Sequence, residues 1–87
     1  MKFDLAQNYP NAFNPSTTIA FSIPRETNVR LAVYDLLGQE VARLVDETMK
    51  PGNHEIVFNA EKVASGTYFY RLTAGSYTAT RKMILLK

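Results

Sequence analysis

Cysteine is absent from the 87-residue sequence, and so are long apolar runs. Without cysteine the chain can form neither a disulfide framework nor a thiolate metal site, and redox chemistry gives no clue to its compartment. No apolar stretch approaches the roughly 20 residues that cross a bilayer. The start, MKFDLAQN, lacks the apolar core of a signal peptide, so if the protein is exported, another segment directs it. With 46% apolar and 21% charged residues, the composition is typical of a soluble globular domain.

Residues suited to catalysis and cofactor binding are also scarce. His54 is the only histidine, and it lies in an alternating run beside Glu55 with nothing to mark it as a general base. Asp46 and Glu47 are adjacent but lack the spacing of a calcium loop, and one histidine cannot provide the paired spacing of a zinc site. Glycine-rich phosphate loops and dinucleotide fingerprints are absent. We therefore expect no catalytic residue, no metal and no cofactor.

Acidic residues are missing from residues 63–87. This stretch carries four cations, Arg71, Arg81, Lys82 and Lys87. A basic block of this kind can meet an anionic partner, or it can protect exposed strand edges from pairing with other chains. The net charge of +2 is too low to favour nucleic-acid binding.

Apolar and polar residues alternate through much of the sequence. In residues 17–23, TTIAFSI, the side chains of Ile19, Phe21 and Ile23 share one face. Residues 28–35, NVRLAVYD, repeat the pattern. A period of two is typical of a half-buried strand. We expect two strands of one antiparallel sheet or sandwich.

Turn residues separate the runs that follow. Asp35 and Gly38 occupy the first and fourth positions of a type I turn, where glycine takes a positive φ at little cost, so we expect a hairpin. Residues 40–45, EVARLV, alternate imperfectly, which predicts either a bulge or an early strand end. A Pro-Gly pair marks another turn before residues 54–58, HEIVF, restore the alternation.

The last third of the chain contains the strongest strand signal. Residues 59–65, NAEKVAS, have no strand pattern and are long enough for a helical turn or a crossover between sheets. Residues 67–74, TYFYRLTA, alternate clearly, and a Gly-Ser turn leads to a last strand within residues 77–87. Tyr68 lies just after the proposed crossover. We therefore expect it to form a tyrosine corner, with its hydroxyl bonded to upstream backbone.

Seven short strands separated by turns, with no convincing helix, predict an all-β fold. The expected architecture is a seven-stranded immunoglobulin-like antiparallel β-sandwich. We expect residues 1–87 to form one domain, in which residues 1–16 are a proline- and asparagine-rich entrance segment and residues 17–87 are the body of the sandwich. A domain this small buries only about 60–65% of the surface that its unfolded chain exposes, so it has little stability in reserve.

The entrance segment contains most of the stretch NYPNAFNPST, residues 8–17. Pro10 and Pro15 each fix φ and push the preceding residue toward extended conformations. The asparagines can bond backbone two residues further on. Such a segment loses less entropy on ordering than a glycine-serine linker does. We therefore expect a rigid entrance, with Tyr9 and Phe13 capping one end of the sandwich.

Three aromatic side chains are candidate ligand platforms: Tyr34, Phe69 and Tyr77. Phe69 lies near Arg71, on the strand face opposite Tyr68. Exposed aromatics beside a cation can stack on bases or sugar rings, but they can also sit at a corner between sheets. The structural role is the interpretation we prefer.

Five blocks of the sequence resemble a known family. They are LAQNYPNAFNPSTTIAFSIP, VYDLLGQEVARLVD, PGNHEIVFNA, ASGTYFYRL and TRKMILLK. In this order they are similar to the type A C-terminal sorting domain of type IX secretion, found on proteins exported by the Bacteroidetes and related phyla. The resemblance runs from about residue 5 to residue 87. The flagellar hook-capping protein carries a related immunoglobulin-like domain, so both candidates imply the same fold.

The resemblance implies a noncatalytic address at the carboxyl end of a larger secreted protein. Its partners would be the outer-membrane secretion machinery, the C-terminal signal peptidase of that machinery and an upstream cargo domain in the same chain. The address is commonly cleaved off as the cargo is attached to a surface lipopolysaccharide. The implied location is secreted or cell surface, reached via the periplasm, with no nucleic-acid partner and no membrane span.

By position, the motifs of the family fall on three stretches of this chain. The matched residues are Pro10, Asn11, Phe13, Asn14 and Pro15 in the entrance motif; Gly66 and Tyr68 in the central Gly-x-Tyr motif; and Lys82, Met83, Ile84, Leu85, Leu86 and Lys87 in the terminal basic-apolar motif. Ala12 departs from the family, which usually has proline there. The change loosens the entrance slightly and leaves the flanking pattern intact.

Two other noncatalytic functions fit the same residues. One is a carbohydrate- or matrix-binding accessory module that uses Tyr34, Phe69 or Tyr77. The other is a structural spacer in a secreted enzyme. Sorting is the function we favour, because several blocks agree with that family in order.

Overall fold

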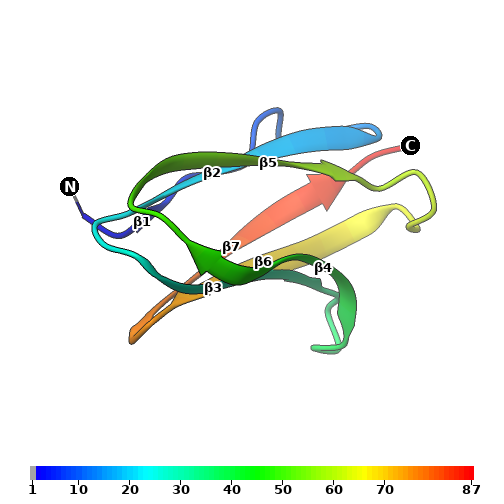
Figure 1. Ribbon diagram of the computed structural model, residues 1–87. Helices are drawn as coiled ribbons and strands as arrows, with labels where there is room; N and C mark the ends of the chain where they lie inside the picture. The colour runs from blue at the N-terminus through cyan, green and yellow to red at the C-terminus, as the bar shows by residue number, and fades with distance from the viewer. Residues whose placement is uncertain (1) are drawn as a thin grey trace.

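A computed structural model describes residues 2–87 of the chain. These residues form seven β-strands and no helix. The strands are β1 (Asp4–Leu5), β2 (Ser16–Ile23), β3 (Thr27–Tyr34), β4 (Glu40–Met49), β5 (Gly52–Asn59), β6 (Gly66–Ala74) and β7 (Tyr77–Leu85) (Figure 1). The all-β prediction is confirmed. The two-residue strand β1 lies inside the entrance segment, where the sequence has no alternation that predicts a strand.

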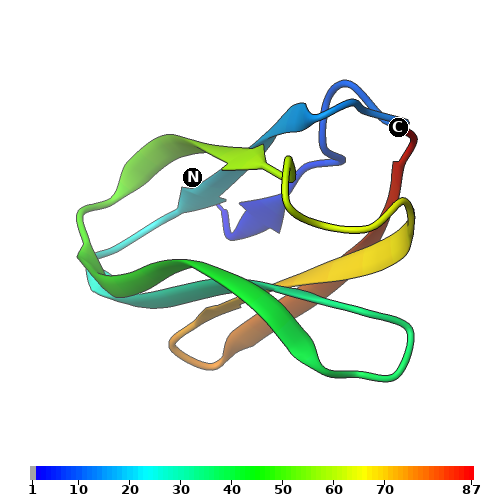
Figure 2. The same ribbon diagram turned by 90° about the vertical axis from the view of Figure 1, so that its right-hand side faces the viewer.

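The strands build two antiparallel sheets that pack face to face (Figures 1 and 2). One sheet has the order β1-β2-β5 and the other the order β4-β3-β6-β7. In the constant-type immunoglobulin order, the fourth strand lies beside the fifth. Here β4 lies beside β3, in the other sheet, and the remaining order is kept. The predicted seven-stranded antiparallel sandwich is confirmed.

The core lies between the sheets and follows the alternation of the sequence. Ile19, Phe21 and Ile23 are at most 3% exposed, and the inward face of β3 is fully buried. Fully burying one such side chain contributes about 1.5–3 kcal/mol. A shift of one residue in β2 would turn all three side chains toward solvent, so the apolar pattern fixes the register of the strand.

The β3–β4 hairpin has the turn that Asp35 and Gly38 predict. The Gly38 N–H donates to the Asp35 carbonyl at 3.0 Å, and Gly38 has a φ of 84°. One Asp35 carboxylate oxygen also accepts the N–H groups of Leu37 and Gln39, both at 2.9 Å. The aspartate therefore holds the tip of the hairpin in a fixed shape.

Strand β4 contains the predicted bulge but not the predicted early end. Leu31 of β3 lies opposite Val45, whereas the next residue, Ala32, lies opposite Arg43, so Leu44 has no partner. A second register shift follows Val33. Each bulge absorbs one residue and lets pairing resume. This is why β4 continues to Met49 despite its irregular pattern, and of the two predicted alternatives the bulge is confirmed.

Residues 60–65 cross from β5 in one sheet to β6 in the other, as expected for a crossover. The turn is closed by a hydrogen bond from the Val63 N–H to the Ala60 carbonyl at 3.0 Å. The Tyr68 hydroxyl donates to the Ala64 carbonyl at 2.5 Å. The predicted tyrosine corner is therefore confirmed. It fixes the point at which the crossover enters β6.

Different segments of the chain lie at the two ends of the sandwich. The N-terminus and the C-terminus lie at opposite ends of the molecule (Figure 1). The end with the C-terminus also holds the start of β2, the β3–β4 hairpin tip and the crossover into β6 (Figures 1 and 2). Across residues 2–87 the structure has no helix of the length and apolarity needed to span a membrane.

Candidate recognition surface

The entrance segment pairs with the outer edge of β7. The Phe13 N–H donates to the Ile84 carbonyl, and the Leu86 N–H donates to the Phe13 carbonyl, each at 3.0 Å. This parallel bridge joins positions that are more than 70 residues apart in the chain. Figure 2 shows the entrance segment beside the C-terminus. Two of the motifs singled out in the sequence therefore form one structural unit.

Side chains of the entrance segment extend this pairing along β7. The Ile84 N–H donates to the Asn11 side-chain oxygen at 3.0 Å, and the Gln7 side-chain amide donates to the Lys82 carbonyl at 2.8 Å. An unpaired strand edge is a template for association with other chains. Here the entrance segment covers the carboxyl-terminal part of that edge, and the side chain of Arg81 helps to hold the segment there by donating to the Leu5 carbonyl.

A buried network anchors the entrance segment to the body. The Tyr70 hydroxyl donates to the Ala6 carbonyl and accepts the Asn8 N–H, both at 2.7 Å. The Asn8 side-chain amide donates to Thr17 Oγ1 at 3.0 Å and to the Pro10 carbonyl at 3.1 Å. The latter bond confirms, for Asn8, the expected contact with backbone two residues on. Tyr70 is fully buried, and Asn8 and Thr17 are each 2% exposed.

Neither Tyr70 nor Asn8 was selected from the sequence as a site residue. Tyr70 shares its strand face with Tyr68 and Leu72, so its position predicts burial but not the partner of its hydroxyl. Burial raises the pKa of the Tyr70 hydroxyl above its ordinary value, although the Asn8 N–H and the Arg81 guanidinium act in the opposite direction. The hydroxyl stays neutral at physiological pH and keeps the proton that it donates to Ala6.

We expect Tyr70→Phe to lower the free energy of unfolding by about 1–3 kcal/mol, because it leaves the buried Asn8 N–H without a partner. The raised pKa also gives a pH dependence. The stability that the neutral hydroxyl contributes is fully present below the unfolded pKa of about 10 and is lost as pH rises through the folded value. Urea denaturation between pH 7 and pH 11 measures both effects.

Tyr34→Phe is the matched control for Tyr70→Phe, because the Tyr34 hydroxyl has no hydrogen bond to any part of residues 2–87. We expect its effect to stay within about 0.5 kcal/mol. The anchoring role of Tyr70 would be contradicted if both substitutions lowered the free energy of unfolding equally. It would also be contradicted if the stability of Tyr70→Phe fell at high pH as much as that of the unchanged domain.

The two aromatics of the entrance segment behave differently. Phe13 is 2% exposed and packs against Phe58, with ring centroids 6.1 Å apart. The prediction that it caps one end of the sandwich is confirmed. Tyr9 is 80% exposed, so the same prediction is wrong for Tyr9. Its backbone pairs with Thr18 of β2, and this pairing turns the ring away from the core.

The residues matched to the family motifs divide into a buried set and an exposed set. The buried set is Phe13, Tyr68, Met83 and Leu85. The exposed set is Pro10, Asn11, Asn14, Pro15, Gly66, Lys82, Ile84, Leu86 and Lys87. Met83 and Leu85 point inward from β7, whereas Lys82 and Ile84 point outward. Only the second set is accessible to a partner, while the first holds the surface in shape.

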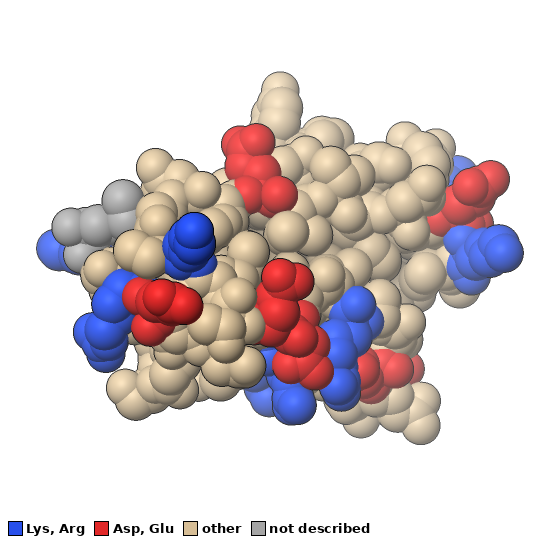
Figure 3. Space-filling view, in the orientation of Figure 1, with Lys and Arg blue, Asp and Glu red and all other residues tan. Residues whose placement is uncertain are grey.

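The last residues also contact the crossover. The Lys87 N–H donates to Ser65 Oγ at 3.2 Å, and its ammonium donates to the Glu61 carbonyl at 2.7 Å. The terminal, central and entrance stretches thus meet at one end of the sandwich. Figure 3 shows both basic and acidic side chains at this end, so its surface is mixed rather than uniformly positive.

A comparison with protein families matches residues 7–86 to the secretion system C-terminal sorting domain. The chain belongs to this family. The matched residues include all three stretches that meet at the end of the sandwich, apart from Lys87. Among curated proteins no significant match is found. Family membership gives the domain a C-terminal sorting role in type IX secretion, which directs proteins to secretion and the cell surface.

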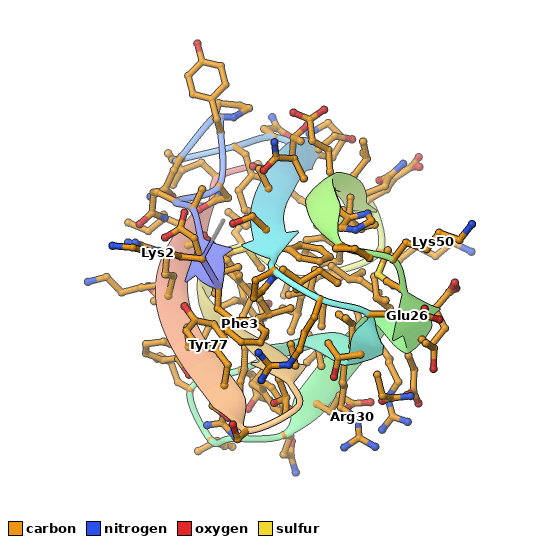
Figure 4. All side chains as sticks on the ribbon, turned by 60° about the vertical axis from the view of Figure 1, so that its left-hand side comes forward. Lys2, Phe3, Glu26, Arg30, Lys50 and Tyr77 are labelled. Atoms are coloured by element: carbon orange, nitrogen blue, oxygen red, sulfur yellow. The ribbon has the colours of Figure 1, made fainter. Side chains whose placement is uncertain are left out.

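The surface aromatics of the sorting domain do not form one site. Tyr34 and Phe69 are neighbours on the outer face of the four-stranded sheet and line one cavity with Arg71. Tyr77 lies elsewhere, stacked on Phe3 with ring centroids 5.0 Å apart (Figure 4). Whether any of them binds a ligand stays a prediction, and the structure limits a shared site to Tyr34 and Phe69.

His54 of the sorting domain is tied to its own strand region. Its Nε2 is 2.8 Å from the Lys50 carbonyl, and its ring stacks on Phe21. No hydroxyl or carboxylate of residues 2–87 is hydrogen bonded to this ring. Within the same residues, no three histidine, cysteine or acidic side chains are grouped as metal ligands. The family itself acts as a sorting signal rather than as an enzyme.

Proposed function

We propose that this domain is a folded address, read at the end of the sandwich that carries the C-terminus. The observation that supports the proposal is that Leu85 pairs with both Phe13 and Gly66, which joins the entrance, terminal and central stretches. The residues read would be the exposed ones, with Lys82, Ile84 and Leu86 at the centre and the entrance prolines beside them. The reader would be the outer-membrane secretion machinery.

The address in this proposal depends on folding, because it is composed of segments distant in sequence. Ile84 is 37% exposed and Leu86 59% exposed, so both offer apolar surface beside the ammonium of Lys82. Their backbone is held in place by the entrance segment rather than left free. A receptor would then meet an ordered surface and lose less entropy on binding than with a flexible tail.

The position of the N-terminus suits a passenger carried on the opposite side. An upstream cargo domain would join the chain at the end away from the proposed address (Figure 1). The receptor would therefore approach without meeting the cargo. We further propose that the fused protein reaches the outer membrane via the periplasm and that the C-terminal signal peptidase of the machinery then acts on it.

The test is export of a reporter fused upstream of residues 1–87 in a host with type IX secretion. Deleting residues 80–87 would remove Met83 and Leu85 from the core, so loss of folding would confuse the result. The sharper variant is Lys82→Glu, Ile84→Glu and Leu86→Glu together, since these side chains point outward. We expect the reporter to reach the surface with the unchanged domain and to stay inside with this variant.

The matched control is Arg30→Glu, Thr48→Glu and Thr78→Glu, which changes net charge by the same amount at exposed positions away from the C-terminal end of β7. We expect this variant to be exported. Circular dichroism establishes that both variants are folded. Equal export of two folded variants would refute the proposed address. Failure of the unchanged domain to export the reporter would limit the family resemblance to fold.

A further inference from the structure

A cavity of about 350 Å³ opens on the outer face of the four-stranded sheet, apart from the proposed address. It is lined by Tyr34, Asp35, Leu36, Gly38, Phe69, Arg71 and Thr80. Tyr34 and Phe69 are cross-strand partners, so their rings lie side by side on β3 and β6. Cavities that hold small molecules are about 300–1,000 Å³, with apolar walls and a few polar groups. This one falls at the small end of that range.

Arg71 is held in a fixed position at this cavity. Its guanidinium carbon lies 5.3 Å from the centroid of the Tyr34 ring, and its Nε donates to Thr80 Oγ1 at 3.3 Å. The terminal nitrogens of Arg71 have no partner within residues 2–87. A guanidinium oriented in this way presents two parallel N–H donors, the geometry that binds a carboxylate or phosphate at two points.

The charges around the cavity favour an anion. Lys82 lies opposite Phe69 on β7, and no carboxylate pairs with Lys82 or Arg71 in the described part of the chain. The ion pairs there are those of Arg43 with Glu40 and with Asp46, both on β4. Asp35 is the only acid that lines the cavity, and one of its oxygens is already engaged by two backbone N–H groups.

We propose that this cavity binds an acidic sugar, with the sugar ring against Tyr34 and Phe69 and its anionic group on Arg71. The rings supply flat apolar surface, the Thr80 hydroxyl and the free oxygen of Asp35 suit sugar hydroxyls, and Lys82 adds positive charge at the rim. An extended acidic peptide fits less well, because Arg71 is the one cation among the described residues that line the cavity. The residues that line this cavity are not part of the proposed sorting address, which shares only Lys82 at the rim, and binding there does not require export.

The test is NMR titration of the 87-residue domain with digalacturonate at about 0.15 M salt, where long-range charge effects are screened. Galactobiose, which has the same rings without carboxylates, is the matched neutral probe. Tetraglutamate and inorganic phosphate are the anionic probes without a sugar. We expect digalacturonate to shift the resonances of Tyr34, Phe69, Arg71 and Thr80, and to bind at least about tenfold more tightly than the other three probes.

Two variants localise the site. Arg71→Gln and Phe69→Ala should each weaken digalacturonate binding about tenfold or more. Arg30→Gln, an exposed cation on the same sheet face, and Tyr9→Ala, an exposed aromatic outside the cavity, should leave it within about twofold. Thermal unfolding shows whether each variant is folded. The proposal is overturned if digalacturonate causes no shifts at the cavity, if galactobiose binds equally well, or if tetraglutamate or phosphate binds as tightly.

Discussion

Replacing Phe13 with alanine is expected to lower the free energy of unfolding by about 3–5 kcal/mol, the usual cost of removing a buried phenylalanine. Phe13 is 2% exposed, packs on Phe58 and pairs through its backbone with Ile84 and Leu86. The cavity left by the ring lies where the entrance segment meets the two sheets. Urea denaturation, followed by circular dichroism, measures the change.

Tyr9→Ala is the matched control for Phe13→Ala, because it removes an aromatic ring from the same segment that is 80% exposed. We expect its effect to stay within about 0.5 kcal/mol, as is usual for surface substitutions. If Phe13→Ala costs no more than Tyr9→Ala, the entrance segment is not docked on the body in solution.

The size of the Phe13 effect matters because the domain is small. Proteins have about 0.05–0.15 kcal/mol of stability per residue, so an 87-residue domain has roughly 4–13 kcal/mol in total. A loss of about 3–5 kcal/mol is then about a quarter of the total or more, and it unfolds the domain if the total is at the low end. An effect of this size would make the entrance segment part of the folding unit rather than a linker before it.

The sequence predicts the strands of this fold well, because one face of each strand is buried and the other is not. Ile19, Phe21 and Ile23 recur with period two, and burial of all three leaves only one register for β2. The hairpin at Asp35 and Gly38 follows from local turn chemistry alone. In both cases the residues that form the deciding pattern lie within a few positions of each other in the sequence.

Other features depend on contacts between residues far apart, which no local pattern records. The Tyr70 hydroxyl meets Asn8, 62 positions away, and only the packing of β6 against the entrance segment brings them together. Tyr9 and Phe13 look alike in the sequence, but the pairing of Tyr9 with Thr18 turns its ring outward. Strand register likewise decides that Tyr34 and Phe69 are neighbours.

The candidate site was identified from the family resemblance more than from the physical properties of its residues. The sequence of the three matched stretches does not show which of their side chains form the candidate recognition surface. Once β7 is known, the alternation shows that Met83 and Leu85 point inward. It does not show which segment pairs with the edge of β7. An edge strand can be covered by any segment that supplies matching N–H and carbonyl groups, and the entrance segment does so partly through the side chain of Asn11.

Neighbouring residues of β7 allow folding and recognition to be separated. We expect Leu85→Ala to lower the free energy of unfolding by about 2–5 kcal/mol, because Leu85 is fully buried between the sheets. Ile84→Ala removes a side chain that is 37% exposed and should cost at most about 1 kcal/mol. Urea denaturation of both variants measures the difference.

Export of a reporter by the same two variants then tells which property the secretion machinery reads. If the outward surface is read, Ile84→Ala reduces export while the domain stays folded, and Leu85→Ala reduces export only as far as it unfolds the domain. A condition that restores folding of Leu85→Ala, such as lower temperature, should then restore its export but not that of Ile84→Ala. The opposite pattern, with export following stability in both variants, would mean that the machinery requires a folded domain and does not contact Ile84.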